Sequence, residues 1–465
     1  MSDTIPANAQ LVVVGAGPGG YHAAFKAAEL GLQVTLIDPA VNPGGVCLYR
    51  GCIPSKALLH VAKLVDEAHE SAAIGVAFKR PVIDIDRVRA WKDEVIEKLT
   101  GGLGQKVVQK KLTYVRGTAR LKDAHTLVVT AHDGTVGEMT FEKAILATGS
   151  RPIMLPGVVK SDRIVNSTGA LELKDVPARL LVVGGGYIGL ELGSVYAALG
   201  SAVSVVEMTN GLLPGCDRDL VSVLKRRLDG KFTAIRLETK VANLVETAGG
   251  VSVTFESNKG EQTVEAFDKV LISIGRRPNT EDLGLETTGI TRDARGFVPI
   301  DGQRRTAEEN IFAIGDIAGE PMLAHKAYAE AEVAAESAAG RKAVYDPRAI
   351  PAVVFTDPEI AWCGLTETQA RTEGIKVKVA KLPWRGNGRT LTLGREDGLT
   401  KLIVDPETDR ILGMAVAGPG AGELIAEGVL AMEMAAVSED LRRTIHPHPT
   451  LSETVYDAAQ SLFKA

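Results

Sequence analysis

The amino-acid sequence predicts an α/β protein with two Rossmann-like dinucleotide-binding domains, and three observations support this fold class. Residues 10–38 combine an apolar strand, a G-x-G-x-x-G turn, an alanine-rich helix and a second strand that ends in an acidic residue. The same succession returns at residues 179–207. The chain has 465 residues, which suggests three or four domains at roughly 100–200 residues each.

The first glycine-rich turn contains Gly15, Gly17 and Gly20, and its second strand ends at Asp38. These glycines permit a tight turn, the approach of a pyrophosphate and close packing of helix on strand, while the helix N-terminus offers N–H groups to phosphates. Asp38 stands where a carboxylate would accept the ribose hydroxyls of an adenosine. A lone glycine pattern also occurs in ordinary βα turns, but strand, helix and acid together predict a dinucleotide site.

The second turn contains Gly184, Gly186 and Gly189, and its acidic residue is Glu207. In both copies 23 residues separate the first glycine from the acid (38 − 15 and 207 − 184). A carboxylate can bind two ribose hydroxyls but repels a 2′-phosphate, and no arginine follows closely in EMTNG, so NAD is favoured over NADP. Two dinucleotides in one chain suit hydride transfer between two cofactors.

Three further segments support this layout. Residues 144–152 and 270–279 are apolar strands that run into Gly and then Arg-Pro, which indicates that the chain leaves a nucleotide domain at each. Residues 306–319 predict a strand ending in Gly-Asp, where Asp316 could accept a hydrogen bond from a cofactor polyol. Taken by itself, this last motif is better explained as a plain turn.

Two of the four cysteines, Cys47 and Cys52, stand close together, and a helix with Pro54 in its first turn is predicted after them. On one ideal helix their Cα atoms would be roughly 8–9 Å apart, beyond the limit of about 7 Å for a disulfide. The pair can form a bridge only if Cys47 precedes the helix or lies on a distorted first turn. Gly44, Gly45 and Gly51 supply the backbone freedom.

The function of this pair has three candidate explanations. A structural staple over so short a loop contributes only about 2–3 kcal/mol. A zinc site needs further ligands, yet Cys216 and Cys363 stand alone and are predicted to be ordinary partly buried thiols, so no metal is expected. A redox pair is favoured, because a helix N-terminus lowers a thiol pKa and the pair directly follows the first nucleotide unit.

Near the C-terminus His448 precedes Glu453 by five residues, with Pro449 between them. A histidine held by a carboxylate can pass a proton to and from a thiol. From the residues alone, a structural histidine at a turn is the better explanation.

The bulk composition excludes several classes of protein. The net charge of −5 and the pI near 6.0 give no reason to expect nucleic acid or an anionic membrane as partner. No apolar run reaches the ~18 residues of a transmembrane helix, and the N-terminus lacks the features of a secretory signal. We therefore expect a cytoplasmic protein, in which a close cysteine pair is more often redox-active or metal-binding than structural.

The motifs together resemble the pyridine nucleotide–disulfide oxidoreductase family over essentially the full length. They are GAGPGG, GGVCLYRGCIPSK, LATGSRP, VVGGGYIGLELG, IGRRPN, IFAIGDIAG, MLAHKA, FTDPEIAWCGLTE, GAGELI and HPHPTLSE. The resemblance adds a C-terminal α+β dimerisation domain to the fold. The segments it implies are the first part of an FAD-binding domain (1–149), an NAD-binding domain (150–275), a central domain completing the FAD site (276–345) and an interface domain (346–465).

The resemblance also implies roles for individual residues. Cys52 would be the thiol nearest the flavin, Cys47 would exchange with substrate, and His448, steered by Glu453, would be the acid–base contributed by the second subunit of a homodimer. Lys56 and Glu191 would pair beside the flavin, and Tyr187 would gate the nicotinamide pocket. The implied cofactor-binding positions are Gly15, Gly17, Gly20, Asp38, Lys56, Gly149, Asp316, Met322, Leu323, Ala324 and His325, with Gly184, Gly186, Tyr187, Gly189, Glu207 and Gly275.

The implied reaction is the oxidation of dihydrolipoamide, carried on lipoyl domains of 2-oxo acid dehydrogenase complexes, with NAD⁺ as final acceptor and FAD and the cysteine pair between them. Alternatives are another NAD(P)H-dependent disulfide reductase of this fold, or a flavin-binding subunit without turnover. The sequence departs from the pattern at Tyr49 and Arg50, where relatives usually carry Asn-Val, and at residues 383–393. We expect the charge of Arg50 to affect the cysteine pair.

Overall fold

The computed structural model describes residues 4–79 and 81–463 and separates into two units. Unit 1 comprises Met1–Ala57, Asp84–Ile153 and Gly275–Asp346, and unit 2 comprises Leu58–Ile83, Met154–Ile274 and Pro347–Ala465. Each is described by itself below. The division into four segments stays a prediction.

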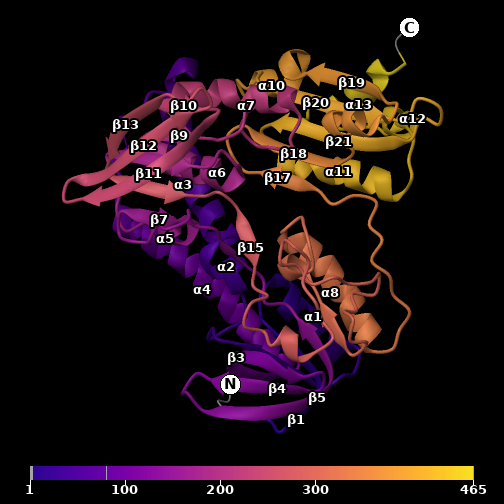
Figure 1. The fold of residues 1–465 in the computed structure, drawn as a ribbon. Helices are drawn as coiled ribbons and strands as arrows, with labels where there is room; N and C mark the ends of the chain where they lie inside the picture. The colour runs from indigo at the N-terminus through magenta and orange to yellow at the C-terminus, as the bar shows by residue number, and fades with distance from the viewer. Residues whose placement is uncertain (1–3, 80, 464–465) are drawn as a thin grey trace. The chain divides into compact units, whose positions relative to one another are not determined.

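Unit 1 is built on a six-stranded sheet in the order β1-β2-β3-β4-β5-β16, in which β1 also pairs with β5 (Figure 1). The pairings of β1 with β2 and β5, of β2 with β3 and of β16 with β5 are parallel, and β4 is antiparallel to both neighbours. The strands are β1 (Asn8–Val14), β2 (Val34–Asp38), β3 (Thr113–Asp123), β4 (Thr126–Ala131), β5 (Val136–Leu146) and β16 (Ile311–Ala313).

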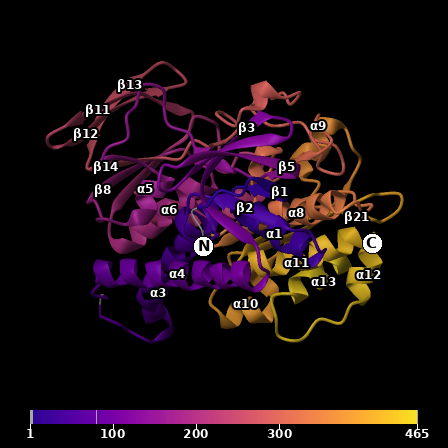
Figure 2. The ribbon, with the colours of Figure 1, turned by 90° about the horizontal axis from the view of Figure 1, so that it is seen from below.

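Two helices of unit 1, α1 (Pro18–Glu29) and α8 (Ala324–Ala338), lie side by side, as Figures 1 and 2 show. Both present buried alanines, whose small side chains let helix backbones approach closely. The alanine-rich helix predicted after the first glycine turn is thereby confirmed. The other helices of unit 1 are α2 (Gly45–Arg50), the first residues of α3 (Cys52–Glu70), α4 (Ile85–Gln109), η2 (Leu285–Thr287) and η3 (Gly315–Ile317), while the rest of α3 and η1 (Ser71–Ile74) are assigned to unit 2.

The two Gly-x-Arg-Pro-type segments meet in unit 1. Strand β6 (Ser150–Pro152) pairs antiparallel with β15 (Arg276–Pro278). The residues before them, Gly149 and Gly275, have φ of 71° and 121°, a region that favours glycine. The two predicted crossing points therefore form one two-stranded ribbon.

Unit 2 contains the second nucleotide sheet, which is parallel and has the order β10-β9-β8-β14-β7. A three-stranded antiparallel sheet, β11-β12-β13, belongs to the same unit. The strands are β7 (Ile164–Asn166), β8 (Arg179–Val183), β9 (Ala202–Val206), β10 (Ala234–Arg236), β11 (Thr239–Thr247), β12 (Gly250–Ser257), β13 (Gln262–Phe267) and β14 (Lys269–Ile272), and the helices are α5 (Ser167–Glu172), α6 (Tyr187–Leu199) and α7 (Arg218–Lys231).

The C-terminal part of unit 2 is an antiparallel sheet, β17-β18-β21-β20-β19, flanked by helices. Trp384 is fully buried there, and its Nε1 donates to Thr400 Oγ1 at 2.9 Å. The elements are β17 (Ala352–Val354), β18 (Glu359–Gly364), β19 (Lys378–Pro383), β20 (Leu399–Val404), β21 (Ile411–Gly418), α9 (Glu367–Glu373), η4 (Trp384–Gly386), α10 (Gly388–Thr392), α11 (Ala421–Glu433), α12 (Ser438–Arg443) and α13 (Glu453–Ser461). The predicted fold class, two α/β nucleotide units and an α+β domain, is confirmed.

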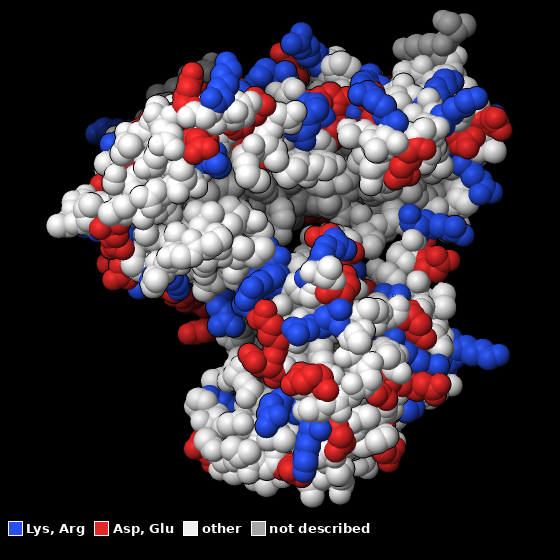
Figure 3. Space-filling model, in the orientation of Figure 1, with Lys and Arg blue, Asp and Glu red and all other residues white. Residues whose placement is uncertain are grey.

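Surface charge is mixed in sign on the face shown in Figure 3, where Lys and Arg side chains are interspersed with Asp and Glu. Among the described residues, no helix combines the length and the apolar character that crossing a membrane requires.

Candidate active site

The two nucleotide units hold their acidic residues in the same way. Asp38 Oδ2 accepts a hydrogen bond from Ala16 N at 2.7 Å, and Glu207 Oε2 accepts one from Gly185 N at 2.7 Å. In both cases the donor directly follows the first glycine of the turn. The second carboxylate oxygen accepts from the backbone N–H two residues further along, at 2.9 Å and 2.8 Å respectively. The sequence repeat is thus a repeat of geometry, with each carboxylate fixed against its glycine turn.

The third glycine of each turn is required by packing. A Cβ added at Gly20 would lie 1.7 Å from Gly15 O, and one added at Gly189 would lie 2.3 Å from Gly184 O. Because these neighbours are backbone atoms, no side-chain movement relieves the clash.

The middle glycine of each turn faces open space. A Cβ at Gly17 would meet only a Cα atom at 3.9 Å, and one at Gly186 would meet nothing within 4 Å. These residues are also the N-caps of α1 and α6, and neither helix start has a side-chain cap. Space above the turn and uncapped N–H groups are what a pyrophosphate needs, so both turns fit a bound dinucleotide.

The cysteines lie on two different helices. Cys47 is in α2, which ends at Gly51 (φ −146°, ψ −110°), and Cys52 begins α3. A Cβ at Gly51 would lie 3.0 Å from Val46 O, so glycine suits this break. The distortion that a Cys47–Cys52 contact requires is therefore present, and the predicted helix with Pro54 in its first turn is confirmed. Both cysteines are in the reduced form in this structure.

The thiol pKa of Cys47 shifts upward. A hydrogen bond with the Cys52 side chain, burial and the charge of Cys52 raise it, and the charge of Lys56 counteracts this rise. The physical reason is that a second thiol close by disfavours ionisation of the first.

A pair of tyrosines that sequence analysis missed accompanies the cysteines. Tyr21 Oη in α1 and Tyr328 Oη in α8 lie 2.5 Å apart, and both rings pack in the hydrophobic cluster that Cys47 also contacts. Burial, the bond to Tyr328 and the nearby thiol charges raise the pKa of Tyr21. The two residues are 307 positions apart, and no local pattern indicates such a contact.

Tyr49 and Arg50, which depart from the family pattern, lie in different environments. Tyr49 Oη donates to Asn42 O at 3.0 Å, and its ring lies against Gly44. Arg50 is exposed at the end of α2. Burial raises the pKa of Asp38 above its usual value, and the charge of Arg50 is the least of the influences that counteract this rise.

Other predicted cofactor residues occupy defined positions in unit 1. Asp316, in η3, accepts a hydrogen bond from Ser150 Oγ at 2.5 Å, and Ser150 in turn accepts from Arg276 Nε at 2.8 Å. Sequence analysis missed Ser150 and Arg276. Lys56 lies in α3, and the Met322–His325 segment leads into α8, with Leu323 as its N-cap.

In unit 2, Glu191 is 3% exposed within α6, and its Oε1 accepts a hydrogen bond from Phe355 N at 3.0 Å. Tyr187 is the first residue of the same helix and is 39% exposed.

His448 and Glu453 are in contact. His448 Nδ1 lies 2.8 Å from Glu453 Oε1, and Thr450 N donates to Glu453 Oε2 at 2.8 Å. The bond from Thr450, and then that from His448, lower the pKa of Glu453, so the carboxylate is ionised at neutral pH. The neighbouring His446 is buried and has its own carboxylate, Glu427 Oε1, at 2.8 Å.

The segment 383–393, which differs from the family pattern, lies beside this pair. Asn387 Nδ2 donates to Thr450 O at 3.2 Å, and a Cβ at Gly388 would lie 4.0 Å from His448 Cε1. Sequence analysis did not indicate this contact.

The remaining two cysteines are buried and therefore unreactive. Cys216 and Cys363 are 3% and 1% exposed, more deeply buried than expected, and burial raises the pKa of each to about 12. Among the described residues no group of His, Cys, Asp and Glu is arranged to hold a metal ion.

Two dinucleotide units and a thiol pair at a helix break define a nucleotide-dependent disulfide oxidoreductase. Residues 9–331 match the family model of pyridine nucleotide-disulphide oxidoreductases, and residues 350–459 match the dimerisation domain of that family. The chain belongs to the pyridine nucleotide-disulphide oxidoreductase family and is an enzyme.

Known relatives cover nearly the whole chain. Dihydrolipoyl dehydrogenase of Vibrio cholerae is 48% identical over 97% of this chain and 95% of the relative, and that of Geobacillus stearothermophilus is 46% identical over the same shares. The crystal structure of LpdA from Mycobacterium tuberculosis superposes with a TM-score of 0.90 at 28% identity, covering 98% of this chain and 100% of that one. The HOCl-induced flavoprotein disulfide reductase RclA from Escherichia coli gives 0.86 at 30% identity, with the same coverage.

Proposed function

We propose that this enzyme oxidises dihydrolipoamide groups, carried on lipoyl domains of 2-oxo acid dehydrogenase complexes, and reduces NAD⁺ to NADH. The observation that carries the proposal is that relatives 42–48% identical over 97–98% of this chain are named dihydrolipoyl dehydrogenase. The thiol pair at the break between α2 and α3 is the group that the chain itself offers for disulfide exchange.

The cofactors are assigned by the two glycine turns. Gly15, Gly17, Gly20 and Asp38 would hold FAD, with Asp316 accepting a hydrogen bond from its polyol, and the turn before α6 together with Glu207 would hold NAD. When bound, FAD supplies a carrier for two electrons between dithiol and nicotinamide. Oxidation of the dithiol releases two electrons and two protons, of which NAD⁺ takes both electrons and one proton as hydride.

The chain's own residues perform exchange and proton transfer. In the oxidised enzyme Cys47 and Cys52 form a disulfide. A thiolate of the substrate attacks the Cys47 sulfur and releases Cys52, on the flavin side, as a thiolate; the second substrate thiol then displaces Cys47, so that lipoamide leaves and the enzyme retains both thiols in reduced form. His448 accepts the proton of the substrate thiol, and Glu453 holds the imidazole so that Nε2 is directed to the sulfur. Lys56 and the buried carboxylate of Glu191 are proposed as further residues that act near the flavin.

The assembly is a homodimer formed through the domain matched by residues 350–459, with His448 completing the site of the partner subunit. The enzyme is proposed to be cytoplasmic, a compartment in which cysteine pairs of this kind are usually catalytic rather than structural. The segments 1–149, 150–275, 276–345 and 346–465 form the four domains.

A second candidate is a disulfide reductase that runs in the opposite direction, since RclA, named a flavoprotein disulfide reductase, shares the fold at 30% identity. Steady-state assays of the purified holoenzyme with dihydrolipoamide and NAD⁺, against glutathione disulfide and NADPH, decide between them. We expect clear preference for the first pair. Preference for the second would overturn the proposed substrate and nucleotide.

A further inference from the structure

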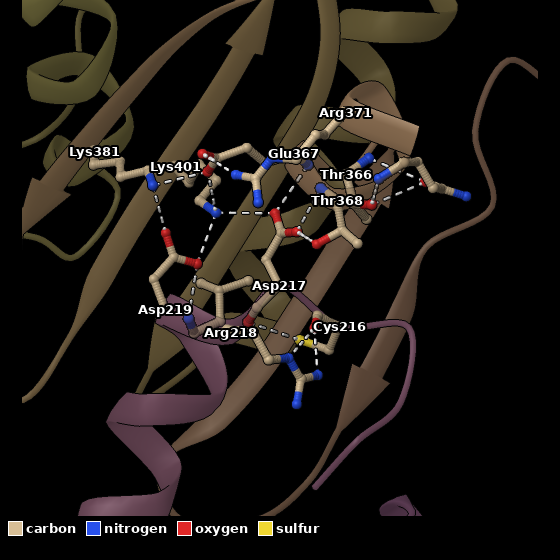
Figure 4. Close-up of polar contacts among 12 residues, drawn as sticks. Cys216, Asp217, Arg218, Asp219, Thr366, Glu367, Thr368, Arg371, Lys381 and Lys401 are labelled. Carbon is tan, nitrogen blue, oxygen red and sulfur yellow. Dashed lines mark hydrogen bonds and ion pairs between the residues drawn. The ribbon is translucent and has the colours of Figure 1, made fainter. Parts of the chain in front are cut away.

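Lys401, in β20, is a fully buried side chain with a charge. Its Nζ lies 2.9 Å from Asp217 Oδ2, 2.7 Å from Asp219 Oδ1 and 3.1 Å from Glu367 Oε2 (Figure 4). Taking an ammonium group out of water is costly, and only such close carboxylates offset the cost. A hydrophobic residue in this strand would avoid that cost altogether, so the position of the charge calls for an explanation.

Asp217 connects Lys401 to two other elements. It stands immediately before α7, the helix that follows the second nucleotide motif. Its carboxylate also accepts hydrogen bonds from Glu367 N and Thr368 N, both at 3.0 Å, and from Thr368 Oγ1 at 2.7 Å. The start of α7 is therefore fixed to the C-terminal sheet through β20 and through the first turn of α9.

The next residue, Arg218, folds the preceding segment around its guanidinium group. Nη1 donates to Leu212 O at 2.7 Å, Nη2 donates to Leu213 O at 2.7 Å, and Nε donates to Cys216 O at 3.1 Å. Arg218 thus fixes the backbone conformation of residues 212–216. Arg218 directly follows Asp217, so its own position depends on the contacts of Asp217.

That segment in turn contacts the second glycine turn. Leu213 N donates to Gly185 O at 2.9 Å, and the N–H of Gly185 donates to Glu207 Oε2 at 2.7 Å. The side chain of Leu212 covers the turn so closely that a Cβ at Gly185 would lie 2.6 Å from Leu212 Cδ2. A continuous series of contacts therefore leads from Lys401 to the carboxylate that distinguishes NAD from NADP.

We propose that Lys401 is a positioning residue for the nicotinamide dinucleotide, acting through Asp217 and the 208–217 segment on Gly185 and Glu207. The proposal rests on the proposed function in that it takes NAD to bind at the second glycine turn. Without Lys401, Asp217 loses its cation, because the contacts of Lys381 are with Asp219 and Glu367. Asp217 then moves away from β20, and the 208–217 segment loses its fixed end. Glu207 then no longer holds the orientation that binds ribose hydroxyls and repels a 2′-phosphate.

The test is direct titration of the full-length holoenzyme with NAD⁺ and with NADP⁺, combined with steady-state kinetics. For Lys401→Met we expect the Kd of NAD⁺ to rise between about 2-fold and about 30-fold. The Kd of NADP⁺ should change less, so the preference for NAD⁺ falls, while the KM for dihydrolipoamide and kcat at saturating NAD⁺ stay unchanged. A general loss of stability would not change the preference between the two nucleotides.

Lys381→Met is the matched control. Lys381 lies 2.9 Å from Asp219 Oδ2 and 2.8 Å from Glu367 Oε2, but its contacts do not include Asp217, and its side chain is 43% exposed. This variant should keep both nucleotide affinities. Equal changes in both lysine variants would overturn the proposal, because the effect would then come from the charge cluster as a whole.

Arg218→Gln provides a second test, which leaves Lys401 and its carboxylates intact. If Lys401→Met does not fold, this second variant tests the proposed series of contacts on its own. We expect the same loss of NAD⁺ preference. If wild-type enzyme prefers NADP⁺, the proposed function fails and this inference fails with it. If wild-type enzyme prefers NAD⁺ and neither Lys401→Met nor Arg218→Gln changes that preference, the inference alone is overturned.

Discussion

His448 Nδ1 lies 2.8 Å from Glu453 Oε1, while the other oxygen of the carboxylate is held by the backbone N–H of Thr450. The carboxylate is thus fixed before it orients the imidazole, and Nε2 is left to exchange protons. We expect His448→Gln to lower kcat for dihydrolipoamide oxidation by about 10²–10⁴-fold. Glu453→Gln should lower kcat less, because the imidazole remains and only its orientation is weakened.

His446→Gln is the control for this prediction. His446 has the same carboxylate-paired geometry, with Glu427 Oε1 at 2.8 Å, but its side chain is only 6% exposed. Its loss should change the thermal midpoint more than kcat. Equal losses of kcat in the two histidine variants, at matched flavin content, would contradict the assignment of His448 as the acid–base.

In the second glycine turn, Gly189 is required by packing, whereas we expect Gly186 to be required by nucleotide binding. Gly189→Ala places a Cβ 2.3 Å from Gly184 O, so we expect a lower thermal midpoint together with loss of nucleotide binding. Gly186→Ala meets nothing within 4 Å and, as a change of N-cap residue, should cost at most about 1 kcal/mol of stability. Its Kd for NAD⁺ should nevertheless rise at least about tenfold, since the Cβ occupies the path of the pyrophosphate. Calorimetry measures the thermal midpoint, and titration measures the Kd for NAD⁺. An unchanged Kd in Gly186→Ala would show that the nucleotide binds elsewhere.

Glu207 is expected to set the choice of nicotinamide. Glu207→Gln keeps the shape of the side chain but removes the charge that repels a 2′-phosphate. The ratio of kcat/KM for NAD⁺ over NADP⁺ should fall at least about tenfold, or 1.4 kcal/mol. Asp38→Asn, the equivalent change in the first unit, should weaken flavin retention and leave that ratio unchanged. A ratio that responds to Asp38→Asn and not to Glu207→Gln would reverse the assignment of the two cofactors.

Local patterns were enough to predict both nucleotide units and the break between the cysteines. A glycine turn and its acid are joined by a strand, a helix and a strand of nearly fixed length, so the spacing in the sequence determines the spacing in space. The contact of Asp38 with Ala16 and that of Glu207 with Gly185 are separated by the same 22 residues. The helix break at Gly51 followed from the dimensions of an ideal helix and the reach of a disulfide.

Contacts between distant elements could not be predicted in this way. Tyr21 and Tyr328 are 307 residues apart, and Lys401 and Asp217 are 184 apart, so no periodicity relates them. Lys401 does carry a signal in hindsight. It is a single charge in LTKLIV, a strand whose residues are all buried, and a lysine in such a strand needs carboxylate partners. The rise in the Cys47 pKa likewise depends on a side-chain contact, with Cys52, that the residue pattern does not describe.

The Lys401 cluster should make stability depend on pH in a defined way. Burial raises the pKa of Asp217, but hydrogen bonds from Lys401 and Thr368 outweigh it and lower the pKa from 3.8 to about 2. A lowered carboxyl pKa contributes stability that is present above pH 3.8 and lost as the pH falls towards 2. Carboxylate contacts likewise outweigh burial and raise the pKa of Lys401 above 10.5, so its contribution persists at neutral pH and is lost only at higher pH.

Lys401→Met should therefore destabilise the enzyme most at neutral pH, by about 3–5 kcal/mol, because it leaves the buried carboxylate of Asp217 without its cation. The difference from wild type should shrink between about pH 4 and pH 2, where protonation relieves the carboxylates in both proteins. Thermal midpoints of the holoenzymes at pH 7, 5 and 3 measure this. Lys381→Met, which removes a half-exposed partner, should shift the midpoint by an amount equivalent to at most about 1 kcal/mol at each pH. If Lys401→Met lowered the midpoint equally at pH 7 and pH 3, its effect would come from lost packing of the side chain and not from its charge.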